Sequence, residues 1–258
     1  MIRSLLIGCG AGLTNRIQTY GVACHWAKKY YRSMTVAWNN TKHCGCKWGD
    51  LFLPPIDFSV IEEYVQPNFE LVGSNKISCL ESILESEDQI VRATSNDLGD
   101  PGPYFENITR NFVPTPEIEK IISDQKKSFP PKMLGVHVRR GDFLTVRKSA
   151  IKPLSEYMRF VKEWTKFLPG VFLCTDDGAS NSVVAYQEVF EGVEDRFRDL
   201  LGDRLFVYPK RSLDRNSVIS IQDALVDLWL LRSCNAIVGT NTSSFSRFAA
   251  IGKLSTMI

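Results

Sequence analysis

The sequence predicts an α/β protein built on doubly wound parallel sheets. In its second half, short apolar runs alternate with segments of helical periodicity. Alternation of this kind builds a parallel sheet with helices on its faces, and ligands then gather at the carboxyl ends of the strands. Four runs rich in Val, Leu, Ile and Phe are the expected buried strands: Met133–Val138, Val171–Cys174, Leu205–Tyr208 and Ala236–Gly239.

Two segments between these strands have the period of amphipathic helices. Ser155–Leu168 places its apolar residues on one face, and Ser155, which follows Pro153, is the expected N-cap. Ser217–Ser233 carries a second apolar stripe.

The first half opens in the same way. A strand at Ser4–Gly8, a helix at Asn15–Tyr30 and a strand at Met34–Trp38 are expected. Later, prolines at 114–116 and 130–131 bracket a short helical segment. We therefore predict two Rossmann-like domains, residues 1–125 and residues 126–258, which face each other across a cleft.

Composition excludes several classes of protein. With 44% hydrophobic and 23% charged residues, the chain is an ordinary globular protein. Its 31 basic residues are scattered among 29 acidic ones, so no nucleic-acid partner is predicted. No run approaches 18 apolar residues, so no transmembrane segment is predicted. Seven cysteines without a repeated spacing predict reduced thiols and a cytoplasmic location.

The turn from Gly8 to Arg16 follows the first predicted strand. Its glycines allow a backbone to approach a ligand, and a helix N-terminus favours an anion. A dinucleotide fingerprint would need glycine where Leu13 stands, and the second strand lacks a following carboxylate. A nicotinamide-dependent oxidoreductase is therefore disfavoured. A ligand-facing loop and a plain structural turn both remain open.

Arg139 and Arg140 follow a predicted buried strand directly, within the run His137-Val-Arg-Arg-Gly-Asp142. Two such guanidinium groups are costly at the end of a buried strand unless anions lie nearby. Their planar donor forks match phosphate oxygens, so the pair predicts a diphosphate site. The alternative is a surface charge pair with Asp142 as an internal partner.

Two further strand or helix ends carry carboxylates. Asp176 and Asp177 could hold a metal, bind a ribose or base, or cap a helix; the D-x-D spacing of metal-dependent sugar transferases is absent. Asp223 and Asp227 share a helix face, from which a carboxylate could accept two donors of a guanine edge. A solvated surface position for Asp223 is the alternative.

Two smaller motifs complete the candidates. The pair Ser243-Ser244 follows a strand and begins a helix, where a phosphate could bind or where the serines could simply cap the helix. The run His43-Cys44-Gly-Cys46 lacks a second ligand pair, so no metal site is predicted.

Together these segments resemble the superfamily of α1,2-, α1,6- and protein O-fucosyltransferases. Gly12-Leu-Thr-Asn15-Arg16 resembles its N-terminal Gly-x-Gly-Asn-Arg loop with one residue inserted, which puts Thr14 at a departure from the pattern. His137–Asp142 matches the H-x-R-R-x-D motif, Phe172–Asp177 matches the strand that ends in Thr-Asp-Asp, and Asp227–Phe245 matches the third motif. The resemblance covers most of residues 5–52 and 133–250.

The resemblance implies a GT-B-like fold, GDP-fucose as donor, a glycan or glycoconjugate acceptor, and inversion without a metal or cofactor. Arg139 would contact the β-phosphate with help from Arg140, and Asp142 is our candidate general base. The other implied substrate-binding residues are Gly12, Leu13, Asn15, His137, Asp176, Asp177, Asp227, Ser243, Ser244 and Phe245. In detail, His137 would lie along the guanosine, Asp227 would accept guanine donors, and residues 243–245 would cradle phosphate or sugar.

Two alternatives stay open beside this one. The chain could be a GT-B transferase that uses another nucleotide sugar, because the motifs mainly concern binding of the nucleotide and not of the sugar. It could also be a noncatalytic module that binds a nucleotide sugar without turnover.

Overall fold

A computed structural model of the chain describes residues 4–62, 89–92, 100–141, 151–176 and 192–258. The chain divides into two compact units. Unit 1 comprises Met1–Ile118 and Arg215–Gln222, and unit 2 comprises Glu119–Asp214 and Asp223–Ile258. The predicted boundary between residues 125 and 126 stays a prediction.

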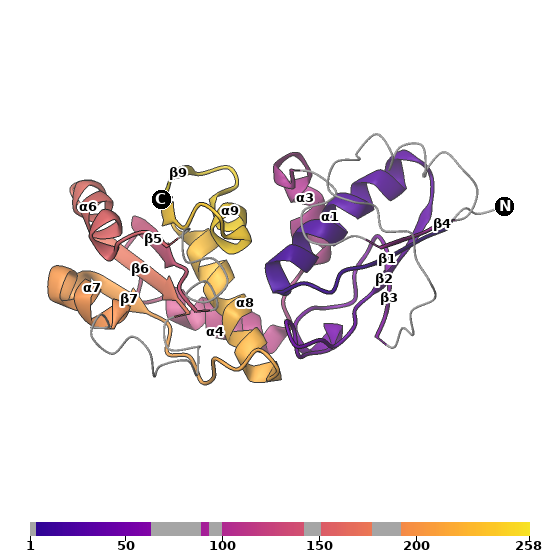
Figure 1. Ribbon diagram of the computed structural model, residues 1–258, viewed down its shortest axis with the longest axis horizontal. Helices are drawn as coiled ribbons and strands as arrows, with labels where there is room; N and C mark the ends of the chain where they lie inside the picture. The colour runs from indigo at the N-terminus through magenta and orange to yellow at the C-terminus, as the bar shows by residue number, and fades with distance from the viewer. Residues whose placement is uncertain (1–3, 63–88, 93–99, 142–150, 177–191) are drawn as a thin grey trace. The chain divides into compact units, whose positions relative to one another are not determined.

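Unit 1 contains a parallel sheet whose described strands have the order β3-β2-β1-β4. Its strands are β1 (Ser4–Gly8), β2 (Ser33–Ala37), β3 (Ser59–Ile61) and β4 (Gln89–Arg92), all visible in Figure 1. Helix α1 (Leu13–Lys29) packs against β1, β2 and α3 (Phe105–Asn111), and short helices η1 (Trp48–Asp50) and η2 (Gly102–Tyr104) complete the unit. The order changes direction at β1, so the loop after β1 lies at a switch point of the sheet, where ligands of such folds bind.

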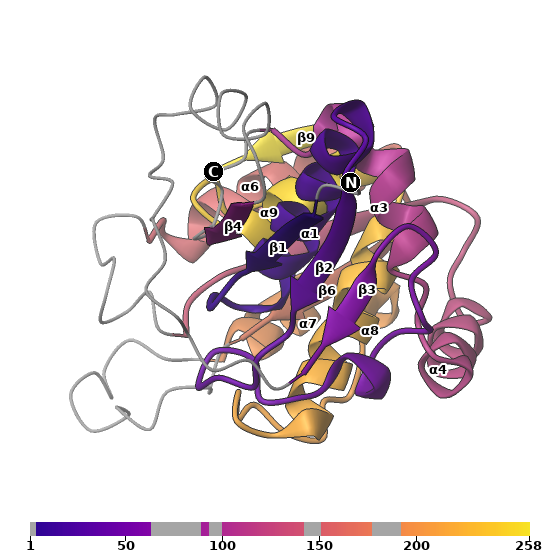
Figure 2. The same ribbon diagram turned by 90° about the vertical axis from the view of Figure 1, so that its right-hand side faces the viewer.

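Unit 2 contains a parallel sheet whose described strands have the order β7-β6-β5-β8-β9. These strands are β5 (Met133–Val138), β6 (Gly170–Thr175), β7 (Leu205–Val207), β8 (Ala236–Gly239) and β9 (Leu254–Met257). The chain runs outward from β5 to β7 and then returns to β8 beside β5. Figure 2 labels β6 and β9 of this sheet. The switch point of this sheet therefore lies between β5 and β8.

Five helices accompany this sheet in the described part of the chain: α4 (Pro116–Lys126), α6 (Leu154–Trp164), α7 (Val193–Leu201), α8 (Val218–Ser233) and α9 (Ser244–Ala250). The first residues of α4 and α8 belong to unit 1.

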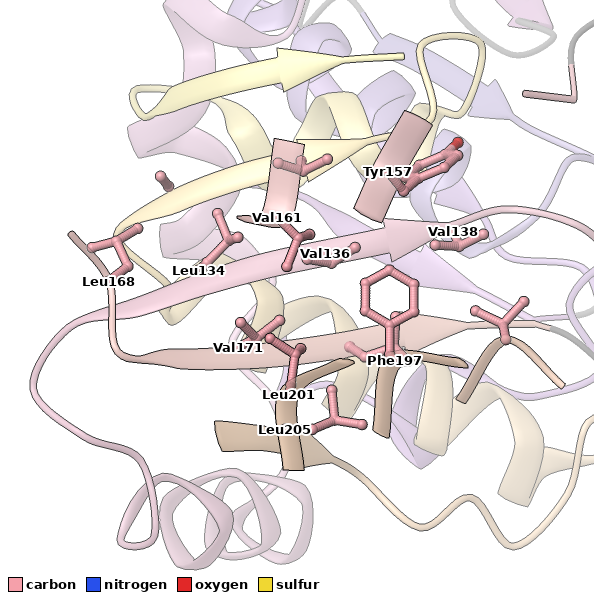
Figure 3. Packing of buried hydrophobic residues seen from close by; sticks show 14 of the residues in the cluster. Leu134, Val136, Val138, Tyr157, Val161, Leu168, Val171, Phe197, Leu201 and Leu205 are labelled. Atoms are coloured by element: carbon pink, nitrogen blue, oxygen red, sulfur yellow. The ribbon is translucent and has the colours of Figure 1, made fainter. Parts of the chain in front are cut away.

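Strand β5 is buried along its whole length because helices cover both of its faces. Leu134, Val136 and Val138 join an apolar cluster with residues of α6 and α7, as Figure 3 shows. Successive strand residues point to opposite faces, so Gly135 points the other way, toward Leu231 of α8. This double coverage explains why β5 is a continuous apolar run rather than an alternating one.

Most predicted elements are present with shifted ends. The bounds of β1, β5 and β8 are as predicted, α8 begins one residue later than predicted, and the helical segment bracketed by prolines is α4. The predicted N-cap Ser155 is wrong. Helix α6 begins at Leu154 with Pro153 in the cap position, because the fixed φ of proline suits a helix entry.

Substitution of Gly135 by alanine should destabilise unit 2. A Cβ atom at this position would lie 2.7 Å from Leu231 Cδ1 and 2.8 Å from Ile237 Cδ1, so neighbouring core side chains would have to move. Overpacking of this kind costs about 1–3 kcal/mol. Urea unfolding of Gly135→Ala measures this loss. Gly49→Ala is the control, because a Cβ there meets nothing within 4 Å; equal effects of the two substitutions would contradict the packing argument.

Candidate functional site

Arg139 and Arg140 emerge from β5 at the switch point of the unit 2 sheet. The backbone amide of Arg139 donates a hydrogen bond to Thr240 Oγ1 at 3.0 Å, and the amide of Arg140 donates to Asp176 Oδ1 at 2.7 Å. Thr240 follows β8 and Asp176 follows β6, so the strands on both sides hold the arginine segment. The backbone of the arginine pair is thus fixed before any ligand binds.

Asp176 also orients the side chain of Arg139. Arg139 Nη1 lies 2.6 Å from Asp176 Oδ2, and the two side chains are 20% and 16% exposed. A Cβ atom on Gly141 would overlap the Asp176 carboxylate, so glycine at this position is what permits the close approach. The arginines and the first Asp of the Thr-Asp-Asp motif, predicted separately, therefore form one cluster. Asp142 and Asp177 lie outside the described residues.

Thr240 is the centre of a buried hydrogen-bond network at the same edge. Its hydroxyl donates to the carbonyl oxygen of His137 at 3.2 Å and accepts from the amide of Arg139. The Tyr157 hydroxyl lies 2.8 Å from the same oxygen, and the Thr240 amide donates to Ser246 Oγ at 2.9 Å. Thr240 was not among the predicted site residues. Its place directly after a buried strand and before the Ser-Ser pair was the available indication.

His137 is a buried part of this network. Its side chain is 3% exposed, its Nδ1 lies 2.6 Å from Ser246 Oγ, and its ring stacks on Phe245 with the centroids 4.8 Å apart. Burial, with the charges of Arg139 and Lys210, holds the pKa of His137 well below its usual value. The imidazole is therefore neutral and links β5 to α9. A contact of His137 with guanosine stays a prediction.

Helix α8 presents two buried carboxylates. Asp227 Oδ2 accepts from Lys210 Nζ at 2.9 Å and from Cys174 Sγ at 3.2 Å, and Asp227 is 1% exposed. Burial raises the pKa of Asp227, and the charge of Lys210 opposes this rise. Asp223 is fully buried, so the alternative of a solvated surface position is wrong. Lys210 belongs to no motif, which is why sequence reasoning missed it.

Ser243 and Ser244 begin α9. Ser243 occupies the N-cap position, is 5% exposed and makes no side-chain hydrogen bond to the helix; its amide donates to the carbonyl oxygen of Thr240. The serines and Phe245 thus adjoin the Thr240 network. Their contact with a phosphate or sugar stays a prediction.

The predicted loop of unit 1 is held by Arg16. This side chain is fully buried and donates to the carbonyl oxygens of Ala11 and Asn39 and to Thr41 Oγ1, at distances of 2.7–2.9 Å. Its guanidinium lies over the Trp38 ring, 4.9 Å from the centroid. Arg16 therefore has a structural role, which the motif alone did not reveal.

The loop residues named from the sequence surround the start of α1. Gly12 is the N-cap with extended backbone, and Leu13 is buried as the first helical residue. Asn15 Oδ1 is buried and accepts no hydrogen bond from the described residues. This oxygen is a buried side-chain acceptor that the described residues leave without a donor.

The described residues contain no group of three or more His, Cys, Asp or Glu side chains that could hold a metal ion. Cys44 and Cys46 have their sulfur atoms 3.7 Å apart and are buried. No helix in the described ranges is long and apolar enough to cross a membrane.

Replacement of Thr240 by valine should destabilise the protein by about 1–3 kcal/mol, because it leaves the Arg139 amide and the Tyr157 hydroxyl without their buried partner. Urea unfolding measures the effect. Thr165→Val removes a hydroxyl that makes one exposed hydrogen bond in the same unit and is the matched control. Similar midpoints for the two variants would show that the network is not a structural element.

The fold is similar to that of several solved structures. No protein-family model and no curated protein matches the chain. Among solved structures, NodZ α-1,6-fucosyltransferase soaked with GDP-fucose is 19% identical, with 97% of this chain and 93% of that chain covered and a TM-score of 0.68. NodZ has also been solved from Bradyrhizobium, with a TM-score of 0.66.

Two other enzymes are similar at lower identity. A mutant of Arabidopsis thaliana FUT1 in complex with GDP is 14% identical, with 98% of this chain and 69% of that chain covered and a TM-score of 0.63. POFUT1 in complex with GDP-fucose is 11% identical, with 100% and 98% covered and a TM-score of 0.55. These similarities confirm the predicted fold: the chain has a GT-B-like α/β fold similar to those of NodZ, FUT1 and POFUT1.

Proposed function

We propose that the chain is a glycosyltransferase that transfers fucose from GDP-fucose to a hydroxyl of a glycan or glycoconjugate. The observation that carries the proposal is the arginine pair, fixed by Asp176 and Thr240 at the switch point of the sheet. Ligands of such folds bind at this edge. The fold is shared with NodZ and POFUT1, both of which have been solved with GDP-fucose.

Arg139 is the proposed principal ligand of the diphosphate. Its side chain is 20% exposed, and Asp176 fixes the orientation of its guanidinium. A guanidinium that is oriented in advance loses less side-chain entropy when it binds phosphate oxygens. In this proposal, residues 126–258 form the nucleotide-sugar domain and residues 1–125 form the acceptor-side domain.

The proposed reaction inverts the anomeric carbon. The acceptor oxygen attacks that carbon as its bond to the β-phosphate oxygen breaks, and GDP leaves with the bonding electrons. Arg139, assisted by Arg140, stabilises the negative charge that develops on the β-phosphate, so the scheme does not call for a metal ion. Asp142 takes the proton of the acceptor hydroxyl.

The remaining predicted residues have supporting roles in the proposal. Asp227 accepts the donors of the guanine edge, and Ser243, Ser244 and Phe245 contact phosphate or sugar. His137, which is buried and stacks on Phe245, lies along the guanosine in the proposal. Asp177 is retained as a substrate-binding residue, and Gly12, Leu13 and Asn15 are retained likewise, with Asn15 Oδ1 as their hydrogen-bond acceptor.

We also propose a cytoplasmic location. The support is that Cys24, Cys44, Cys46, Cys174 and Cys234 are buried thiols without a disulfide in the described structure. Reduced thiols are typical of proteins in reducing compartments.

A ligand panel combined with an activity assay tests the function. GDP and GDP-fucose should raise the melting temperature, since a ligand at 100 times its Kd stabilises by about 2.7 kcal/mol, whereas UDP-sugars and NAD should not. GDP-mannose tests the alternative of another donor sugar. In the activity assay, the chain should release GDP from GDP-fucose when an acceptor is added. Stabilisation by GDP-fucose without any turnover would favour the noncatalytic module.

Arg139→Ala should lower kcat/KM by at least about 30-fold. Loss of one buried contact to a charged group costs about 2–5 kcal/mol, and each 1.36 kcal/mol is a factor of ten in rate. The control is Arg198→Ala, because Arg198 lies on the surface of the same unit and its side chain is 53% exposed. Near-normal turnover by the Arg139 variant would refute the proposed role.

A further inference from the structure

The two buried carboxylates of α8 hold the segment that follows β7. Asp223 Oδ1 accepts from the Tyr208 hydroxyl at 2.9 Å and from Arg211 Nε and Nη2 at 3.0 and 2.7 Å, while its Oδ2 accepts from the Arg211 amide at 2.7 Å. One helical turn later, Asp227 Oδ2 accepts from Lys210 Nζ at 2.9 Å. Neighbouring residues of one segment are therefore paired with successive carboxylates of one helix.

The two carboxylates differ in how many of their oxygens accept hydrogen bonds. Both oxygens of Asp223 accept hydrogen bonds. Asp227 uses only Oδ2, for Lys210 and Cys174, whereas its Oδ1 is buried and has no hydrogen-bond partner in the described structure. A buried oxygen without a donor costs about 1–3 kcal/mol. A carboxylate with a purely structural role would resemble Asp223, so the geometry of Asp227 points to a donor that the described residues do not supply.

Lys210 determines which oxygen is left for that donor. Its Nζ lies 2.9 Å from Asp227 Oδ2 and 2.6 Å from the carbonyl oxygen of Thr175, at the carboxyl end of β6. The ammonium group is thus anchored at two points. Burial alone would lower the pKa of Lys210, but Asp227, Cys174 and Asp176 together outweigh burial and keep this pKa above its ordinary value.

We propose that Lys210 is a positioning residue for nucleobase recognition: it holds Oδ2 of Asp227 and places its positive charge against that carboxylate, so that Oδ1 accepts from the edge of guanine. This inference rests on the proposed function, because it requires a guanine nucleotide as ligand. The exocyclic 2-amino group of guanine is a donor that hypoxanthine lacks. Lys210 therefore sets the preference for guanine over hypoxanthine without touching the base.

Calorimetric titration of the full chain with GDP and with inosine diphosphate tests the inference. The unmodified chain should bind GDP at least about tenfold more tightly, which is the effect of one hydrogen bond to a charged group. Lys210→Met should weaken GDP binding by about tenfold or more with little change for inosine diphosphate, so the ratio of the two affinities should fall below about threefold. Lys210→Arg should largely restore the ratio.

Arg211→Met is the matched control, because it breaks the neighbouring pair with Asp223 and should leave the ratio unchanged. If circular dichroism shows that Lys210→Met does not fold, Lys210→Gln removes the charge and keeps a donor, and the same fall in the ratio is expected.

The outcomes separate this inference from the function on which it rests. A ratio unchanged by loss of the Lys210 charge, or reduced equally by Arg211→Met, would overturn the inference. Equal binding of both nucleotides by a chain that transfers fucose would also overturn it and leave the function intact. Binding of neither nucleotide would remove the proposed function itself.

Discussion

The structure of the site depends on how two adjacent arginines are stabilised at the end of a buried parallel strand. Guanidinium groups in such a position are costly unless an opposite charge lies nearby and acceptors take hydrogen bonds from their N–H groups. Asp176 forms an ion pair with the side chain of Arg139 and accepts a hydrogen bond from the amide of Arg140. Thr240 accepts a hydrogen bond from the amide of Arg139. Both partners come from strands beside β5, so the strand order itself makes the arrangement possible.

Charges at this edge of unit 2 are grouped in pairs of opposite sign. Arg139 lies against Asp176, and Lys210 lies against Asp227 and the last residue of β6. Pairing makes burial of these groups tolerable and restricts their orientations. His137 is neutral, because burial and the charges of Arg139 and Lys210 hold its pKa well below the usual value. In the proposed function, this edge is thereby organised for an anionic ligand before that ligand arrives, which is the condition for electrostatic stabilisation of a leaving phosphate.

Unit 1 uses a buried arginine differently. Arg16 has its Nε, Nη1 and Nη2 atoms engaged by the loops that follow β1 and β2, and its planar face lies on Trp38. A guanidinium satisfied in this way cross-links two loops and is not available to a ligand. The same residue type thus organises a loop in one unit and presents donors in the other. The difference lies in whether backbone carbonyls or a carboxylate surround it.

The sequence by itself determined the elements and the place of the arginine pair, because apolar runs and helical periods are local properties. The side chains of Met133–Val138 are enough to predict a buried strand. The residues after such a strand lie at the ligand-binding edge of a parallel sheet. Only the tertiary structure decided the partners. Arg139 and Thr240 are 101 positions apart. Lys210, which pairs with Asp227, lies in the segment after β7, where the sequence has no motif. Strand order and helix packing bring such residues together, and no local pattern records them.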